Sequence, residues 1–178
     1  MKPALPRGDE EFFSDADDDT PAGDFVFKAG HNPKKTGSVT SKPSKELTTM
    51  DLLHNEMQNA LFDKLVKEHG ADFVGTENST GASTSIDVVV QTAEYCYFYE
   101  IQTAVSVKAC IRQALPQLLE YAYWGTKKDI ADKLIVVGQK KITKQAQAYL
   151  EFLRDTFKLP LHYEDHSVRR KKAANKKR

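Results

Sequence analysis

Hydrophobic residues recur every three or four positions in three stretches of the chain, which predicts three helices. The first helix begins at Thr48 or Thr49, the second after Ser106 and the third after Thr143, because each of these hydroxyl side chains can cap a helix. We expect the inward stripes to be Leu53, Met57, Ala60, Leu61, Leu65 and Val66 in the first helix, and Ala146, Tyr149, Leu150, Leu153 and Phe157 in the third.

Short runs of β-branched and aromatic residues predict strands between the helices. The predicted strands cover residues 72–76, 86–90, 95–102, 134–137 and, as an edge strand, 161–163. The polar run 78–84 is predicted to be a loop. The resulting order is helix, three strands, helix, strand, then helix and strand. This order predicts an α/β domain whose central mixed sheet is flanked by helices, with a parallel crossover between residues 95 and 137.

Charge divides the chain into a domain and two tails. Residues 1–50 carry a net charge of −2, residues 51–167 of −4 and residues 168–178 of +7, although the whole chain carries only +1. We predict a disordered acidic and polar tail over 1–47, a folded domain over 48–165 and a basic tail over 166–178. The apolar island Phe25-Val26-Phe27 can dock on the domain or on a partner, but we predict a solvated linker there.

The composition excludes several classes of protein. No run approaches the roughly 18 apolar residues of a membrane span, and the N-terminus lacks the apolar stretch of a secretory signal, so we expect a cytoplasmic protein. Two cysteines, Cys96 and Cys110, exclude a disulfide framework and an all-cysteine zinc site. The seven cations of the basic tail favour a nucleic-acid partner bound through its phosphates, with a solubilising tail as the alternative.

Two carboxylates on neighbouring strands are the candidate chemistry of the chain. Asp87 lies within the apolar run 86–90, and Glu100 and Gln102 point to one face at the end of the next strand. If the two strands form a hairpin, Asp87 lies near Glu100, and two close carboxylates repel each other unless a cation lies between them. Mg²⁺ or Mn²⁺ suits such oxygen ligands, and the carbonyl of Ile101 can add another. The alternative is a solvent-facing carboxylate on an edge strand.

The helix that follows presents polar side chains on one side: Arg112, Gln113, Gln117 and Tyr121. Arg112 suits bidentate contact with phosphate, although it can also pair with Glu120 or Asp87. Gln117 and Tyr121 can equally serve ordinary helix packing. Pro116 deletes one backbone hydrogen bond, so we expect the helix to kink or break beside Gln117.

An αβββαβ order with Asp87 on one strand, Glu100-Ile-Gln102 on the next and Gln117-Leu-Leu-Glu-Tyr121 on the following helix resembles the PD-(D/E)XK nuclease superfamily over about residues 50–164. The resemblance implies a restriction endonuclease-like fold. It also implies a metal-dependent hydrolase of DNA phosphodiester bonds that acts in phage defence or DNA processing. Such nucleases commonly dimerise to cut both strands, which leaves a homodimer open.

The resemblance also implies roles for particular residues. Asp87 and Glu100 would hold Mg²⁺ or Mn²⁺, Gln117 and Tyr121 would position the scissile strand, and either Glu56 or Glu77 would complete the site. Gln102 departs from the family, which usually has lysine at this position. Glutamine can orient a water molecule but brings no positive charge to the transition state. The alternative is therefore a weak or inactive relative that binds nucleic acid or a protein.

Overall fold

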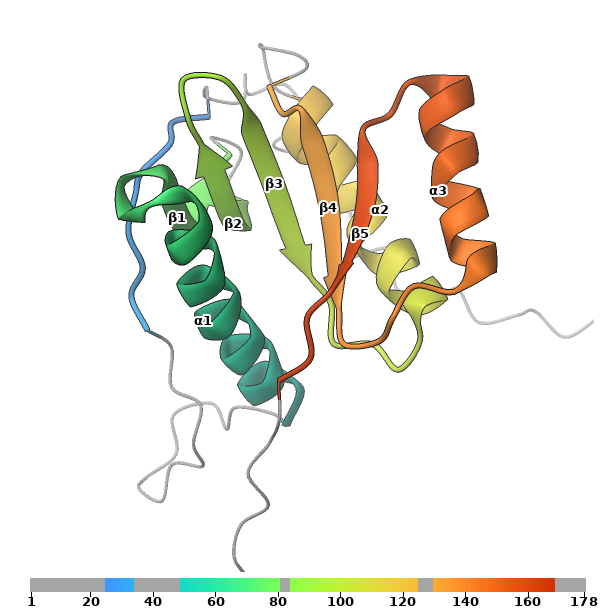
Figure 1. The fold of residues 1–178 in the computed structure, drawn as a ribbon, viewed down its shortest axis with the longest axis horizontal. Coiled ribbons are helices and arrows are strands. Elements are labelled where there is room, and N and C mark those ends of the chain that lie inside the picture. Colours follow the sequence, from blue (N-terminus) through green and yellow to red (C-terminus); the bar gives the residue numbers. More distant parts are fainter. Residues whose placement is uncertain (1–24, 34–48, 81–83, 125–129, 169–178) are drawn as a thin grey trace, which may run out of the picture.

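The chain forms an α/β domain with a five-stranded mixed sheet flanked by helices (Figure 1). The computed structural model describes residues 25–33, 49–80, 84–124 and 130–168. Most of the predicted N-terminal tail and nearly all of the basic tail therefore lie outside the described residues.

The sheet follows the chain from one edge to the other. Its strands are β1 (Val74–Ser79), β2 (Ser85–Gln91), β3 (Cys96–Ile101), β4 (Lys133–Gly138) and β5 (Leu161–Asp165). The β1–β2 and β2–β3 pairs are antiparallel, whereas β3–β4 and β4–β5 are parallel. The predicted hairpin and the predicted parallel crossover are therefore both present.

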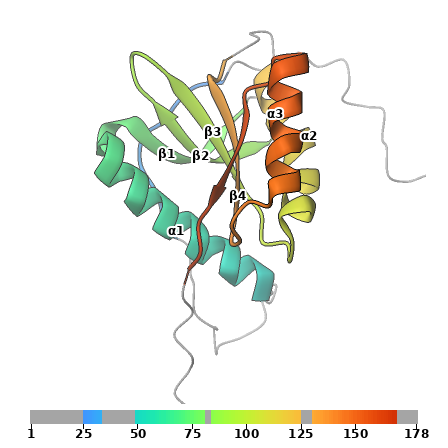
Figure 2. The same ribbon diagram turned by 45° about the vertical axis from the view of Figure 1, so that its right-hand side comes forward.

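The helices cover both faces of the sheet. Helix α1 (Thr49–His69) packs on one face, and α2 (Val107–Tyr123) and α3 (Lys144–Phe157) pack on the other (Figure 2). The hydroxyls of Ser106 and Thr143 cap α2 and α3 as predicted, each accepting a hydrogen bond from the third backbone N–H that follows. Helix α2 continues without a break through Pro116.

Two apolar clusters form the core. One lies between α1 and the sheet and includes Met57, Leu61 and Leu65. The other lies between the sheet and the pair α2 and α3. Strand β4 contributes Leu134 and Val136 to the second cluster and Ile135 and Val137 to the first, so its apolar run is buried on both faces, as predicted. Cys110 is buried and Cys96 half-buried, and both are free thiols.

Both boundaries of β1 and the inward face of α3 differ from the sequence expectation. A short 3₁₀ turn over Ala71–Phe73 precedes β1, which extends to Ser79, so the first two positions of the predicted loop at 78–84 belong to the strand. Tyr149 and Phe157 do not face inward, since 45% and 59% of their surfaces are exposed. The physical reason is that α3 packs along one narrow stripe, made by Ala146, Leu150 and Leu153.

Residues 25–33 are not a solvated linker. Phe25 and Phe27 pack against the apolar cluster between the sheet and the pair α2 and α3. The Phe25 and Phe98 rings meet edge to face, with their centroids 5.2 Å apart. The segment then follows the outer edge of β1, where Gly30 forms a parallel bridge with Gly75. A Cβ at Gly75 would lie 2.0 Å from the Lys28 carbonyl oxygen, so only glycine permits this approach. The segment covers an otherwise open sheet edge.

Across the described part of the chain, none of the helices is both long enough and apolar enough to span a bilayer.

Candidate functional site

The site begins at a local distortion of β1 and β2. The β1–β2 ladder pairs Thr76 with Val88 and Asn78 with Ile86. It skips Glu77 and Asp87, which lie between these two pairs. Glu77 has a φ of 52°, in the left-handed region that residues other than glycine rarely adopt. Strained backbone of this kind concentrates at functional sites. The distortion interrupts the regular ladder at Asp87.

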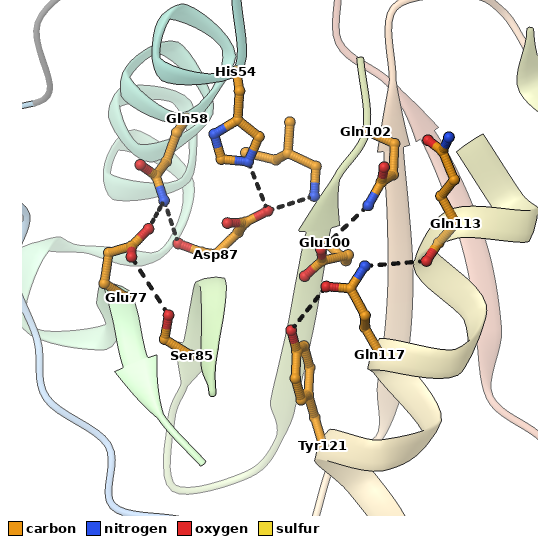
Figure 3. A network of polar contacts seen from close by, with 11 residues as sticks. His54, Gln58, Glu77, Ser85, Asp87, Glu100, Gln102, Gln113, Gln117 and Tyr121 are labelled. Atoms are coloured by element: carbon orange, nitrogen blue, oxygen red, sulfur yellow. Dashed lines mark hydrogen bonds and ion pairs between the residues drawn. The ribbon is translucent and has the colours of Figure 1, made fainter. Parts of the chain in front are cut away.

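Asp87 is held by two donors from different elements (Figure 3). Its Oδ2 accepts the Ile101 N–H at 2.8 Å and lies 3.0 Å from Nε2 of His54 on α1. These contacts fix the carboxylate next to the end of β3. Within the described residues its other oxygen, Oδ1, accepts no hydrogen bond. In a strand, the C=O and N–H of one residue point to the same side, so the Ile101 carbonyl also faces β2.

Gln58 of α1 joins the two distorted strands. Its side chain is fully buried, and its amide nitrogen donates to the Asp87 carbonyl at 2.9 Å and to Glu77 Oε1 at 2.7 Å. The Asp87 carbonyl and the Glu77 carboxylate therefore share one donor. Neither Gln58 nor His54 was predicted from the sequence as a site residue. The available signal was their four-residue spacing, which places two polar side chains on one helix face beside the apolar stripe.

Glu100 is the buried carboxylate of the site. Only 5% of its surface is exposed, its Oε1 accepts from the Gln102 amide at 3.3 Å, and its Oε2 has no hydrogen-bond partner among the described residues. Burial, and then the negative charges of Asp87 and Glu77, raise the pKa of Glu100 to about 9, although the Gln102 amide opposes this shift. Asp87 and Glu100 therefore lie close enough to repel each other, as the hairpin predicted.

Helix α2 supplies a chain of polar side chains beside Glu100 (Figure 3). The Tyr121 hydroxyl donates to Gln117 Oε1 at 3.3 Å, and the Gln117 amide donates to the Gln113 carbonyl at 3.1 Å. Tyr121 is 7% exposed, and its pKa is raised by burial and by the charges of Glu100 and Asp87. Gln117 and Tyr121 thus line the carboxylate pair.

Arg112 and Gln113 occupy the exposed side of α2. Within the described residues, Arg112 forms no ion pair with Glu120 or Asp87. The side chain of Arg112 is therefore open to a ligand, whereas Gln113 joins the site through its backbone carbonyl.

Of the two acids proposed to complete the site, Glu77 is the one that the geometry connects to it. Its charge acts on Glu100, and its carboxylate shares Gln58 with Asp87. Glu56 lies between His54 and Gln58 on α1 and its Oε2 is buried, but its charge is not among those that raise the pKa of Glu100.

Two carboxylates of the site are candidate ligands for a hard divalent cation. In the described part of the chain, no group of three or more His, Cys, Asp or Glu side chains is arranged to hold a metal ion. Mg²⁺, however, commonly binds through only one or two carboxylates and keeps several waters. Asp87 Oδ1 and the buried Glu100 Oε2 provide two such oxygens without a protein partner. A cation between them would remove the repulsion that raises the Glu100 pKa.

Comparisons of the chain with protein-family models, curated proteins and solved structures found no match.

Proposed function

We propose that the chain is a metal-dependent nuclease with a restriction endonuclease-like core that hydrolyses DNA phosphodiester bonds. The support is the order α1-β1-β2-β3-α2-β4 together with the positions of its polar residues. Asp87 and Glu100 lie on adjacent strands, and Gln117 and Tyr121 of the next helix lie beside them. This is the arrangement that the resemblance in the sequence implies.

The buried carboxylate pair is the observation that carries the proposal. An ionised carboxylate inside a protein is unfavourable unless it is paired or binds a metal. Glu100 is 5% exposed, has one unpartnered oxygen and faces the second carboxylate, Asp87. A folded chain retains such a pair at a cost in stability. A cation ligated by both groups accounts for the pair.

The chain's own residues would hold the cation and position the substrate. Asp87, Glu100 and the Ile101 carbonyl are the ligands that we assign to Mg²⁺ or Mn²⁺, with Glu77 beside them. A bound divalent ion lowers the pKa of water and stabilises charge on a phosphate. His54 and the Ile101 N–H orient Asp87. The Gln102 amide can orient a water molecule, and Gln117 and Tyr121 can hold the strand that is cut.

A second candidate is a protein that binds nucleic acid at this site without cutting it. The observation that favours it is Gln102, whose neutral amide contacts Glu100 where the family usually has lysine. A neutral amide cannot offset the charge that develops on the phosphate.

A cleavage assay separates the two candidates. Plasmid and linear DNA are incubated with the full chain in Mg²⁺, Mn²⁺ or EDTA, beside Asp87→Ala and Gln102→Lys. We expect metal-dependent cutting that Asp87→Ala reduces about a hundredfold or more, because a metal supplies several kcal/mol of transition-state stabilisation. Asp132→Ala is the control, since Asp132 is exposed and bonds only the far end of β3.

Each result has a defined meaning. Cutting by Gln102→Lys but not by the natural chain would establish the binding protein, silenced at one residue. Cutting that Asp87→Ala leaves intact would remove the metal site from this position. The absence of cutting by all forms would contradict the nuclease proposal.

A further inference from the structure

Five basic residues lie on the connections and helices at the end of the sheet where the candidate site lies. The parallel strands β3, β4 and β5 end at one edge, and the connections from β3 to α2 and from β4 to α3 run beside each other there (Figures 1 and 2). The basic residues of these connections and of the N-terminal halves of the two helices that follow are Lys108, Arg112, Lys140, Lys141 and Lys144. All five are exposed. We name this set the lysine edge.

Contacts between the two connections bring the lysine edge to the site. A Cβ on Gly138, the last residue of β4, would lie 3.2 Å from the sulfur of Cys110 on α2. The charge of Lys140 acts on the same thiol, and the Tyr163 hydroxyl fixes the Lys140 backbone with a 2.8 Å hydrogen bond to its carbonyl. The Cys110 thiol in turn lies 3.7 Å from the Gln102 carbonyl oxygen. These contacts place the Lys140 end of the lysine edge near the Gln102 backbone.

The charges of the lysine edge are not neutralised within the described residues. None of its five side chains forms an ion pair there. Lys64 on α1 shows the contrast, because it pairs with both Glu68 and Glu164. Asp165, at the end of β5, is an exposed acid at the same end of the sheet.

Two helices of the lysine edge also break a local charge rule. The first turn of a helix favours acidic residues, because the helix dipole places partial positive charge there. Helix α1 follows the rule with Asp51, but α2 and α3 have no acid in the first turn and carry Lys108 and Lys144 instead. Lys108 and Lys144 therefore lie where a positive charge destabilises the helix. Two such lysines on neighbouring helices indicate that their charge has a function.

We propose that the lysine edge binds the phosphate backbone of DNA beyond the phosphate that is cut. This inference rests on the proposed function, since it assigns the substrate's flanking segment to the surface beside Gln102. Lysines at such a surface contact phosphates as point charges, so the binding is independent of sequence and strongly dependent on salt. Arg112 is the member of the lysine edge that directly precedes Gln113 on α2, so we assign the passage of one strand from this surface into the site to this position.

The test is the salt dependence of DNA binding by the full chain. Fluorescence anisotropy with a labelled DNA duplex is measured in EDTA, which prevents metal-dependent cutting, over a series of salt concentrations. We expect the Lys140→Ala/Lys144→Ala double variant to bind on the order of tenfold more weakly at moderate salt. It should also lower the slope of log K against log salt by about 2, because each lost phosphate contact contributes about 0.9.

The matched control is Lys67→Ala/Lys158→Ala, which removes the same charge from the last turn of α1 and the C-cap of α3, at the far ends of those helices. Thermal unfolding establishes that both variants are folded. A smaller slope for Lys140→Ala/Lys144→Ala alone supports the proposal. Equal slopes for both variants, with the natural chain binding DNA, would overturn the lysine edge and leave the nuclease proposal standing. The absence of DNA binding by the natural chain would overturn both.

Discussion

Glu100 on β3 and Val136 on β4 are direct neighbours in the parallel ladder, yet they are opposites in chemistry. Both are buried, at 5% and 0% exposure. Val136 belongs to the apolar cluster beneath α2 and α3. Glu100 instead meets Asp87, the Gln102 amide and the Tyr121 hydroxyl. The same level of one sheet therefore contains a packed core and a strained polar site.

The comparison teaches that the sheet does not need a carboxylate at this level. Val136 occupies the equivalent position on the next strand, β4, and apolar burial stabilises it there. A glutamate there loses hydration and meets a second negative charge, both of which raise its pKa. The difference is characteristic of a residue kept for function at the expense of stability.

Introducing a carboxylate at Val136 on β4 should have the largest effect on stability. Val136→Glu introduces a charge into the apolar cluster without the polar neighbours of Glu100, so we expect the free energy of unfolding to fall by about 3–5 kcal/mol. Urea unfolding at neutral pH measures it. Val136→Ala, which only leaves a cavity, is the control. A Glu variant no less stable than the Ala variant would show that both strands tolerate charge equally.

Removing the titrating carboxyl of Glu100 should change how stability depends on pH. The Glu100 pKa is about 9 in the folded protein, against an ordinary value of 4.5 for glutamate, so between these values the folded state keeps a proton that the unfolded state loses. Stability of the metal-free chain therefore falls as pH rises through this window, by at most about 1.4 kcal/mol per pH unit from this group. Glu100→Gln should remove that contribution, and urea unfolding at several pH values in EDTA measures the difference.

Glu94→Gln is the matched control for this change, because Glu94 is an exposed carboxylate in the turn between β2 and β3. Mg²⁺ should stabilise the natural chain most at the alkaline end of the window, where Glu100 is ready to ionise, and should have no such effect on Glu100→Gln. Identical pH profiles for the natural chain and Glu100→Gln would contradict the burial of a titrating carboxyl.

The smallest effect is expected from removing the Tyr121 hydroxyl beside Glu100. Tyr121→Phe removes the hydroxyl that donates to Gln117 and faces Glu100, while the ring still fills the core. A hydrogen bond of this kind contributes about 0.5–1.5 kcal/mol, so cutting at saturating Mg²⁺ should slow by about two- to tenfold. Tyr149→Phe on the exposed side of α3 should leave the rate unchanged. Equal rates for the natural chain and Tyr121→Phe would assign Tyr121 to packing.

The sequence alone determined the local elements. Ser106 and Thr143 marked the starts of two helices because caps act within one turn, and the apolar run 134–137 marked a strand because burial on both faces leaves no polar position. The spacing of Glu100 and Gln102 also anticipated their contact, since alternate residues of a strand share a face.

Only the tertiary structure decided which distant residues meet. His54 and Gln58 reach Asp87 across 33 and 29 residues, Gly30 closes against Gly75, and Phe25 packs on Phe98. Hydrophobic periodicity predicts which face of an element is apolar, but not what covers that face. For this reason it predicted that Tyr149 and Phe157 face inward, whereas both are exposed. Contacts at long separation depend on how the elements pack, and packing is a property of the whole chain.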